Sequence, residues 1–241
     1  MSGHSKWNNI KHKKEKADAA KAKIFTKIGK EMAVAIKEGG PDPSNNSKLR
    51  DLIAKAKANN VPNENIQRTI KKFTDSNDIN YEEITYEGYG PSGVAIIVET
   101  STDNRNRTAG NVRAAFNKYG GNLGQNGCVG FLFEEKGVIT IVDEDDELDE
   151  DKVMEDALEC GAEDIKCDEG EYTIYTAVED FADVREAVIA LGYKLATADL
   201  AKVPSTYVDL DSDEDIENME KMLDKFNEDD DVNAVYHNWN A

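Results

Sequence analysis

The sequence predicts an α+β protein with several domains: an N-terminal three-helix bundle and two α/β sandwich domains, one ferredoxin-like and inserted in the other. Three observations lead to this fold class. Apolar residues recur at helical spacing over the first 75 residues. Short apolar runs separated by glycine-rich turns begin after Asp78. From Gly137 onward, a βαββαβ order, which is the ferredoxin-like order, fits within about 65 residues.

The first 75 residues predict three helices. The first runs from about Glu15 to Glu38, because Ile24, Ile28 and Met32 share one face. Gly39-Gly40-Pro41 then ends it. A second helix fits residues 48–60, and a third follows Val61-Pro62. Short helices joined by short loops form a small bundle. We therefore expect a basic helical domain over residues 1–78, preceded within it by a polar, basic arm at residues 1–14.

The chain after residue 78 predicts strands and helices in alternation. EEITYEG and GVAIIVET indicate two strands around the turn-rich GYGPSG, a helix follows over residues 104–118, and CVGFLFEE indicates a third strand. The later expected elements are strand Gly137–Val142, helix Leu148–Cys160, strands Glu163–Asp168 and Tyr172–Val178, helix Ala182–Leu191, strands Tyr193–Leu200 and Thr206–Leu210, helix Asp213–Phe226 and strand Val232–His237. Residues 79–132 hold too few strands to form a domain alone. We expect them to join residues 204–241 in a discontinuous α/β domain, with residues 133–203 inserted as the ferredoxin-like one.

The charge on the chain is segregated. The formal net charge is −20, yet residues 1–75 carry 17 Lys and Arg against 8 Asp and Glu. An acidic protein as a whole is repelled by nucleic acid, but a basic module needs only its own local field to attract a polyanion. The three cysteines do not suggest a disulfide framework. No apolar run is long enough to span a bilayer, and the N-terminus lacks a secretory signal. These features predict a cytoplasmic protein without a membrane partner.

Lysines line one side of the first predicted helix, roughly opposite its apolar stripe. They are Lys16, Lys23, Lys27, Lys30 and Lys37. Most such charge runs are merely solvated, but a solvated face usually mixes signs, and this one is nearly all lysine. The arm adds further candidates for nucleic-acid contact: Lys6, Trp7, Lys11, Lys13 and Lys14. Lysine supplies charge rather than base readout, so we expect binding to the phosphate backbone. Trp7 either stacks on unpaired bases, which favours RNA, or packs on the bundle.

A second basic group lies inside the acidic part of the chain. Arg105 and Arg107 occupy the first turn of a predicted helix whose N-cap we expect at Thr102 or Asp103. Cations at that end oppose the helix dipole. Their presence indicates either an anionic partner or pairing with a carboxylate of the acidic domain. Together with Arg113 and Lys118 they form a small basic island.

The sequence contains no recognisable catalytic centre. The three histidines lie at the extremes of the chain, and no zinc, nucleophile-elbow or phosphate-loop motif is present. Cys128 is expected to be a structural thiol. The acidic run 143–151 lacks calcium-loop spacing and is expected to be solvated. We therefore expect no enzyme activity, no cofactor and no metal.

Several long motifs resemble one family. GHSKWNNIKHKKEKADAAKAKIFTKIGKEM, YEGYGPSGVAIIVET, TDNRNRTAGNVRAAFNKYGGNLG and DDVNAVYHNW all look like the YebC/PmpR family, nearly end to end. The resemblance implies a three-helix N-terminal domain and two α/β domains, the last inserted in the second. It also implies a probable DNA-binding transcriptional regulator, or a relative of the mitochondrial translational activator of cytochrome oxidase, which is associated with ribosomes. Cys128 stands where a small hydroxyl residue is expected.

The resulting hypothesis is a non-enzymatic, monomeric nucleic-acid-binding regulator of gene expression. It controls either transcription through DNA or translation through ribosomal or messenger RNA, with a possible place on the ribosome. The alternative is a protein-interaction adaptor whose acidic α/β domains dock a basic partner. A nucleic-acid hydrolase is disfavoured because no metal-binding constellation is visible.

Overall fold

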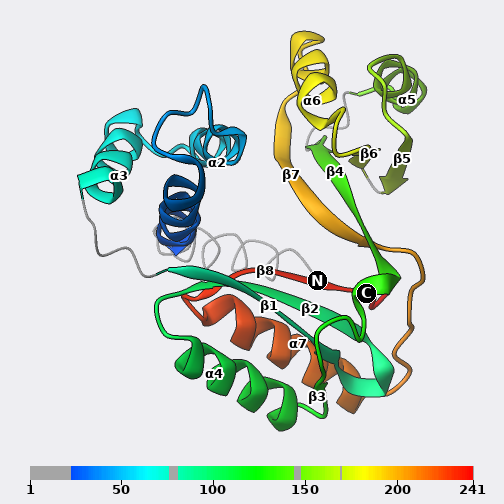
Figure 1. The fold of residues 1–241 in the computed structure, drawn as a ribbon. Helices are drawn as coiled ribbons and strands as arrows, with labels where there is room; N and C mark the ends of the chain where they lie inside the picture. Colours follow the sequence, from blue (N-terminus) through cyan, green and yellow to red (C-terminus); the bar gives the residue numbers. More distant parts are fainter. Residues whose placement is uncertain (1–22, 76–80, 144–147, 169, 241) are drawn as a thin grey trace, which may run out of the picture.

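The computed structural model describes residues 23–75, 81–143, 148–168 and 170–240 of the chain. It shows a mixed α/β architecture with two four-stranded antiparallel sheets, in agreement with the predicted class. Two helices cover the lower face of the first sheet (Figure 1). The N-terminal helices and the second sheet stand beside each other over its upper face, and a cleft of about 370 Å³ lies between the three. No helix in the described ranges is long and apolar enough to cross a membrane.

The N-terminal helices form a core of their own. The first helix covers residues 23–39 of the described chain, and α2 (Ser47–Ala58) and α3 (Asn63–Asp75) follow. Ile28, Met32, Leu49 and Ile66 are fully buried together, as their helical spacing predicts. Every member of this cluster comes from the three helices. The bundle therefore does not depend on the sheets for its hydrophobic stabilisation.

A single asparagine fastens the first helix to α2. The Asn46 side chain accepts from the Leu49 N–H at 3.0 Å, which caps α2. Its amide nitrogen donates to the carbonyls of Ala35 and Gly40, each at 2.8 Å. A Cβ at position 39 would lie 2.8 Å from that nitrogen, so Gly39 leaves room for the amide. The predicted end of the first helix at the glycines is confirmed. The three hydrogen bonds of the Asn46 side chain, which we call the Asn46 clasp, hold that end against α2.

The first sheet has the strand order β3-β1-β2-β8, with α4 and α7 packed on one face. Its C-terminal strand β8 pairs with β2, so that Ile96 lies opposite His237. Strand β2 is buried along nearly its whole length, because it is covered on both faces. The elements are β1 (Glu82–Tyr89), β2 (Ala95–Thr102), α4 (Arg105–Lys118), β3 (Asn122–Leu123), α7 (Asp213–Glu228) and β8 (Val232–His237).

The second sheet has the order β5-β6-β4-β7, and all its neighbouring strands are antiparallel. Ile139, Ile141 and Ile174 are buried in one cluster with Phe181 and Val184 of α6. In chain order the six elements read βαββαβ. They are β4 (Phe133–Val142), α5 (Glu150–Glu159), β5 (Asp164–Asp168), β6 (Glu171–Thr176), α6 (Phe181–Ala190) and β7 (Leu195–Pro204).

Two predicted strands were wrong in part. The strand expected at residues 128–135 begins only at Phe133, where it is the start of β4, and residues 128–132 are a bend and a short 3-10 helix, η2 (Gly130–Leu132). The cause is the Glu87 carboxylate, which accepts the N–H groups of Gly127, Val129 and Gly130 at 2.7–2.9 Å and so removes them from any ladder. The strand expected at Thr206–Leu210 is reduced to one bridge, between Val208 and Trp239.

Removal of the Asn46 clasp tests this account of the bundle. We expect Asn46→Ala to lower the free energy of unfolding by about 2 kcal/mol, because a cap, one buried hydrogen bond and one partly buried hydrogen bond are lost. Urea denaturation followed by circular dichroism measures the change. Asn45→Ala is the control, because its amide makes an exposed bond to Asp42. Equal losses in the two variants would contradict the clasp.

Candidate nucleic-acid interface

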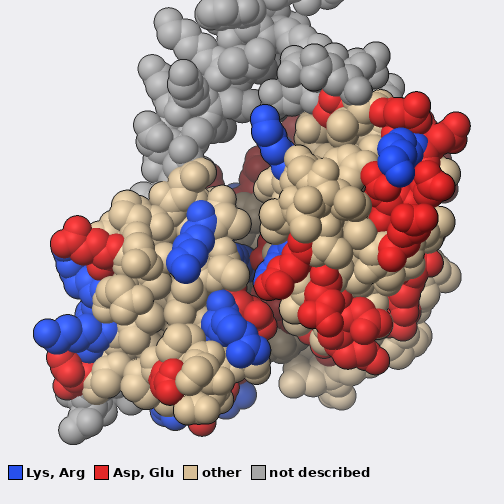
Figure 2. All heavy atoms as spheres, turned by 90° about the horizontal axis from the view of Figure 1, so that it is seen from above, with Lys and Arg blue, Asp and Glu red and all other residues tan. Residues whose placement is uncertain are grey.

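Basic and acidic side chains are distributed differently over the molecule. On the face shown in Figure 2, both signs are interspersed over the N-terminal helices, whereas acidic residues gather over the unit built on the second sheet. The candidate lysines Lys6, Lys11, Lys13, Lys14 and Lys16, together with Trp7, lie outside the described residues. The remaining candidates lie on the first helix and on α4.

Three lysines of the first helix contact the C-terminal end of α7. Lys23 and Lys27 donate to the carbonyls of Glu228 and Asn227, at 3.5 and 3.4 Å. Lys30 donates to the carbonyl of Asp230 at 2.8 Å. The last carbonyls of a helix lack intrahelical partners and carry the negative end of its dipole. Lys23 and Lys27 therefore cap the last turn of α7, and Lys30 binds the turn that follows it. Lys37, beyond this contact, is exposed.

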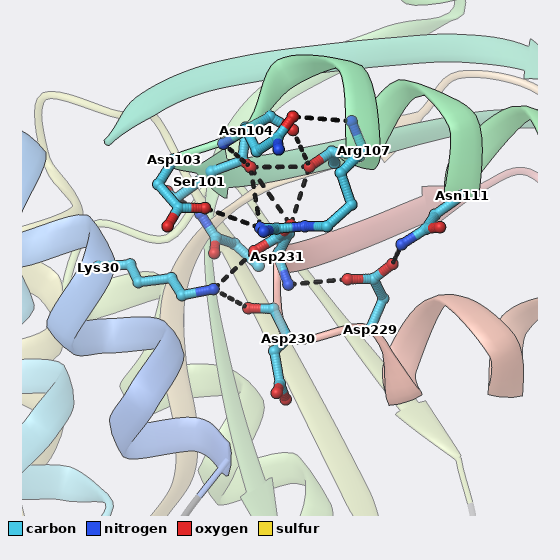
Figure 3. Close-up of polar contacts among 12 residues, drawn as sticks. Lys30, Ser101, Asp103, Asn104, Arg107, Asn111, Asp229, Asp230 and Asp231 are labelled. Carbon is cyan, nitrogen blue, oxygen red and sulfur yellow. Dashed lines mark hydrogen bonds and ion pairs between the residues drawn. The ribbon is translucent and has the colours of Figure 1, made fainter. Parts of the chain in front are cut away.

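Asp231 is the centre of the contact (Figure 3). Its carboxylate accepts from Lys30 at 2.7 Å, from the Arg107 guanidinium at 2.6 Å and from the Thr108 hydroxyl at 2.9 Å. The residue is 3% exposed. Burial alone would raise the pKa of Asp231, but the hydrogen bonds from Lys30, Arg107 and Thr108 outweigh it and lower the pKa to about 2. Asp231 is therefore ionised throughout the physiological pH range.

Lys27 lies in a different electrostatic environment. Burial is the main cause that lowers its pKa, and the neighbouring Lys23 adds to the effect. Asp229 and Asp230 oppose it. An anion placed beside Lys27 would stabilise its charged form in the same way as these carboxylates.

The basic island on α4 is divided by its contacts. Asn104, not Thr102 or Asp103, is the N-cap of α4, and it accepts from the Arg107 N–H at 3.0 Å. Arg107 pairs with Asp231 and also with Asp103 at 2.8 Å. For Arg107, the alternative of pairing with a carboxylate is thus the one observed.

Arg105 and Arg113 have another environment. Both are exposed, and within the described part of the chain neither forms an ion pair. No Asp or Glu occurs anywhere in α4. The outer face of this helix therefore carries an uncompensated positive charge in the acidic part of the sequence. Its exposed residues are Arg105, Asn106, Arg107, Gly110, Asn111, Arg113, Ala114, Asn117 and Lys118.

A cleft of about 590 Å³ lies where α4, the end of α7 and the first helix meet. Lys118 and Lys225 line one part of it, and residues 228–231 supply acidic groups to another. Sequence reasoning missed both Lys225 and the acidic residues. The signal for the latter was visible as four consecutive acids, EDDD, at the end of a predicted helix.

The structure also describes the environment of Cys128 and of the side chains that could bind a metal ion. Burial raises the pKa of the Cys128 thiol, and the nearby Glu87 carboxylate adds to this effect, which disfavours the nucleophilic thiolate. Within the ranges that the structure covers, no group of three or more His, Cys, Asp or Glu side chains is arranged to hold a metal ion.

Comparison with known proteins decides the family. Residues 5–76 match the family profile described as "TACO1/YebC protein N-terminal domain", and residues 81–239 match "TACO1/YebC second and third domain". The chain belongs to the TACO1/YebC family. A relative from Acetivibrio thermocellus is 56% identical over 240 residues, and one from Agathobacter rectalis is 57% identical, each covering 99% of both chains. Both are named "Probable transcriptional regulatory protein".

A solved structure of the same architecture is also similar. It is a conserved hypothetical protein from Aquifex aeolicus, with a TM-score of 0.83 and 42% identity over 92% of this chain and 91% of that one. The sequence-based assignment to the YebC family is thus confirmed. Membership of the TACO1/YebC family does not by itself identify the ligand, so the exposed side chains of this chain are the relevant evidence.

Asp231 gives a testable pH dependence. Its pKa is depressed in the folded state, so its contribution is present above its unfolded pKa of about 3.9 and is lost as the pH falls through about 2. The depression from 3.8 corresponds to about 2 kcal/mol. We expect Asp231→Asn to cost about 3 kcal/mol at pH 7, because Lys30 loses a buried partner. The difference from the wild type should shrink below about pH 4.

Urea denaturation at several pH values measures this dependence. Asp103→Asn is the control, since it removes only an exposed partner of Arg107 and should cost less than about 1 kcal/mol. A difference between wild type and Asp231→Asn that stayed constant down to pH 2 would contradict the assigned role of this carboxylate.

Proposed function

We propose that this protein is a non-enzymatic regulator of gene expression that binds nucleic acid. The names of its relatives support a role in regulation. The basic N-terminal helices make the first contact and the outer face of α4 the second. This assignment uses three structural parts: residues 1–78 as the basic helical domain, residues 79–132 with 204–241 as a discontinuous α/β domain, and residues 133–203 as an inserted ferredoxin-like domain.

The outer face of α4 is the observation that carries the proposal. Arg105 and Arg113 lie about two turns apart on an exposed helix without a carboxylate. Such a face repels basic partners and attracts phosphate. Asn106 and Asn117 add exposed amide groups beside the arginines. The small exposed residues Gly110 and Ala114 allow a backbone to approach closely, which suits contacts with phosphate and sugar.

The lysines add charge without base recognition. Lys37 is free to contact phosphate, and the arm residues Lys6, Lys11, Lys13 and Lys14 would extend the contact. The relatives' names favour transcription, a process in which the bound nucleic acid would be DNA. The scarcity of arginine in the helical domain and the aromatic Trp7 favour RNA, and with it ribosome-associated translation.

The adaptor alternative has its own supporting observation. The acidic side chains that gather over the second sheet's unit in Figure 2 could dock a basic protein. An adaptor of this kind would not need Arg105 or Arg113. Variants of these arginines therefore discriminate between the two functions.

We expect Arg105→Gln/Arg113→Gln to weaken binding to single-stranded RNA and to duplex DNA about tenfold at about 100 mM salt. Two lost phosphate contacts should also reduce the slope of log affinity against log salt, by about 1.8 for duplex DNA or about 1.4 for a single strand. Fluorescence anisotropy with labelled oligonucleotides at several salt concentrations measures both quantities.

The matched control is Lys194→Gln/Lys221→Gln, which removes the same charge from exposed positions outside α4. It should change affinity less than about twofold. If the arginine variant keeps wild-type affinity and slope for both nucleic acids, α4 is not a contact surface and the adaptor becomes the better explanation.

A sedimentation experiment separates the two regulatory versions. If the protein acts in translation, we expect it in the ribosomal fractions of a sucrose gradient, from which the charge-neutralised α4 variant should be depleted. Rising salt should release the wild type, because the contact is electrostatic. Absence of the wild type from these fractions at low salt would contradict the translational version and leave the DNA-binding one.

A further inference from the structure

Lys23, Lys27 and Lys30, which we call the lysine face of the first helix, already contact an acidic segment of the same chain. Residues 228–231, which we call the acidic turn, carry four consecutive carboxylates. Their main-chain carbonyls and the Asp231 carboxylate receive the ammonium groups of Lys23 and Lys30. Lys27 lies in the field of Asp229 and Asp230. The acidic turn thus offers these lysines carbonyl oxygens, one buried carboxylate and the negative field of its other carboxylates, and the oxygens of a phosphate backbone could replace them.

The acidic turn does not depend on the lysines for its shape. Asp229 accepts from the Asn111 amide at 3.0 Å and from the Asp231 N–H at 2.9 Å. Asp231 is held by Arg107 and Thr108 of α4 as well as by Lys30. If the lysines left, α4 would still brace the turn. It is therefore a preformed surface, from which the first helix can separate.

Two further contacts between the described part of the bundle and the sheets are ionic. Lys48 pairs with Glu83 at 2.7 Å and Lys55 with Asp199 at 3.3 Å, and all four side chains are partly exposed. The apolar cluster of the bundle includes no side chain from the sheets. Exposed ion pairs contribute little and are weakened by salt. A polyanion can compete with contacts of this kind, whereas it could not displace a shared hydrophobic core.

We propose that the acidic turn is a built-in competitor that masks the lysine face until nucleic acid displaces it. This inference rests on the proposed function and adds its regulation. Lys23, Lys27 and Lys30 exchange the turn for phosphates, and the bundle moves away from the end of α7. The apparent affinity for nucleic acid is then the intrinsic affinity multiplied by the fraction of molecules whose lysine face is unmasked. Non-specific adhesion is suppressed, because a weak polyanion cannot offset the lost internal contacts.

Asp230 is the position at which to test the mask. It is exposed, and its side chain points away from the Asp231 centre in Figure 3. Asp230→Lys would repel Lys27 and Lys30 and leave Asp231 with its α4 partners. Glu220→Lys is the matched control, because it makes the same change of charge at another exposed position of α7.

We expect Asp230→Lys to tighten binding of a roughly 20-nucleotide single-stranded RNA about tenfold, and Glu220→Lys no more than about twofold. Separation of the bundle is measured independently by energy transfer. Dyes are placed at Glu64→Cys in α3 and Glu220→Cys in α7 of the full chain, with Cys128, Cys160 and Cys167 replaced by Ser. Saturating RNA should lower the transfer efficiency, and Asp230→Lys should lower it without RNA.

The outcomes separate this inference from the function on which it rests. Equal gains in affinity for the two lysine variants, or unchanged energy transfer at saturating RNA, would overturn the mask and leave nucleic-acid binding intact. If neither the wild type nor Asp230→Lys binds RNA or DNA at low salt, the proposed function itself fails.

Discussion

The buried Asp231 carboxylate is the interaction on which the arrangement depends. It lies where the first helix, α4 and the end of α7 meet, and it binds a side chain from each of the first two. A buried charge is costly unless it is fully paired. The depressed pKa shows that here the partners more than offset the cost of burial. The turn that carries it leads directly into β8, and the main-chain carbonyl of Asp231 accepts from the Ser101 N–H of β2 at 2.8 Å.

This carboxylate separates the basic groups into two kinds. Lys30 and Arg107 are paired with it, so a nucleic acid can reach either of them only if its pair with Asp231 breaks. Arg105, Arg113 and Lys37 point to solvent and are available to a partner. A charge count treats all five alike. Their partners show which cations a nucleic acid could reach without first breaking an internal contact. Substitutions of the unpaired cations therefore report on binding, whereas substitutions of the paired ones also affect stability.

Helices and strands with a clear period were predictable from the sequence, and residues that bond to distant backbone were not. The apolar spacing of Ile28, Met32 and Leu49 defined the bundle, and strand β8 was placed to the residue. The first half of the strand expected at residues 128–135 failed because Glu87, about 40 residues away, accepts its N–H groups. No local pattern contains that information. Lys23, Lys27 and Lys30 of the expected lysine stripe contact the end of α7, which lies about 200 residues away in the sequence.

The contact between the lysines and the acidic turn follows from the charge segregation itself. A strongly basic segment joined to a strongly acidic one finds its own chain at a far higher effective concentration than any external polyanion. Pairing within the molecule is therefore the default, and the question becomes how strongly it holds. Here it is held by ammonium–carbonyl and ion-pair contacts around one buried carboxylate, and the apolar cluster of the bundle contains no side chain from the sheets within the described ranges. These contacts hold the bundle against the acidic turn when no nucleic acid is bound. A competing array of phosphates can still displace them. The same acidity that would repel nucleic acid from the chain as a whole can then set the threshold for its binding.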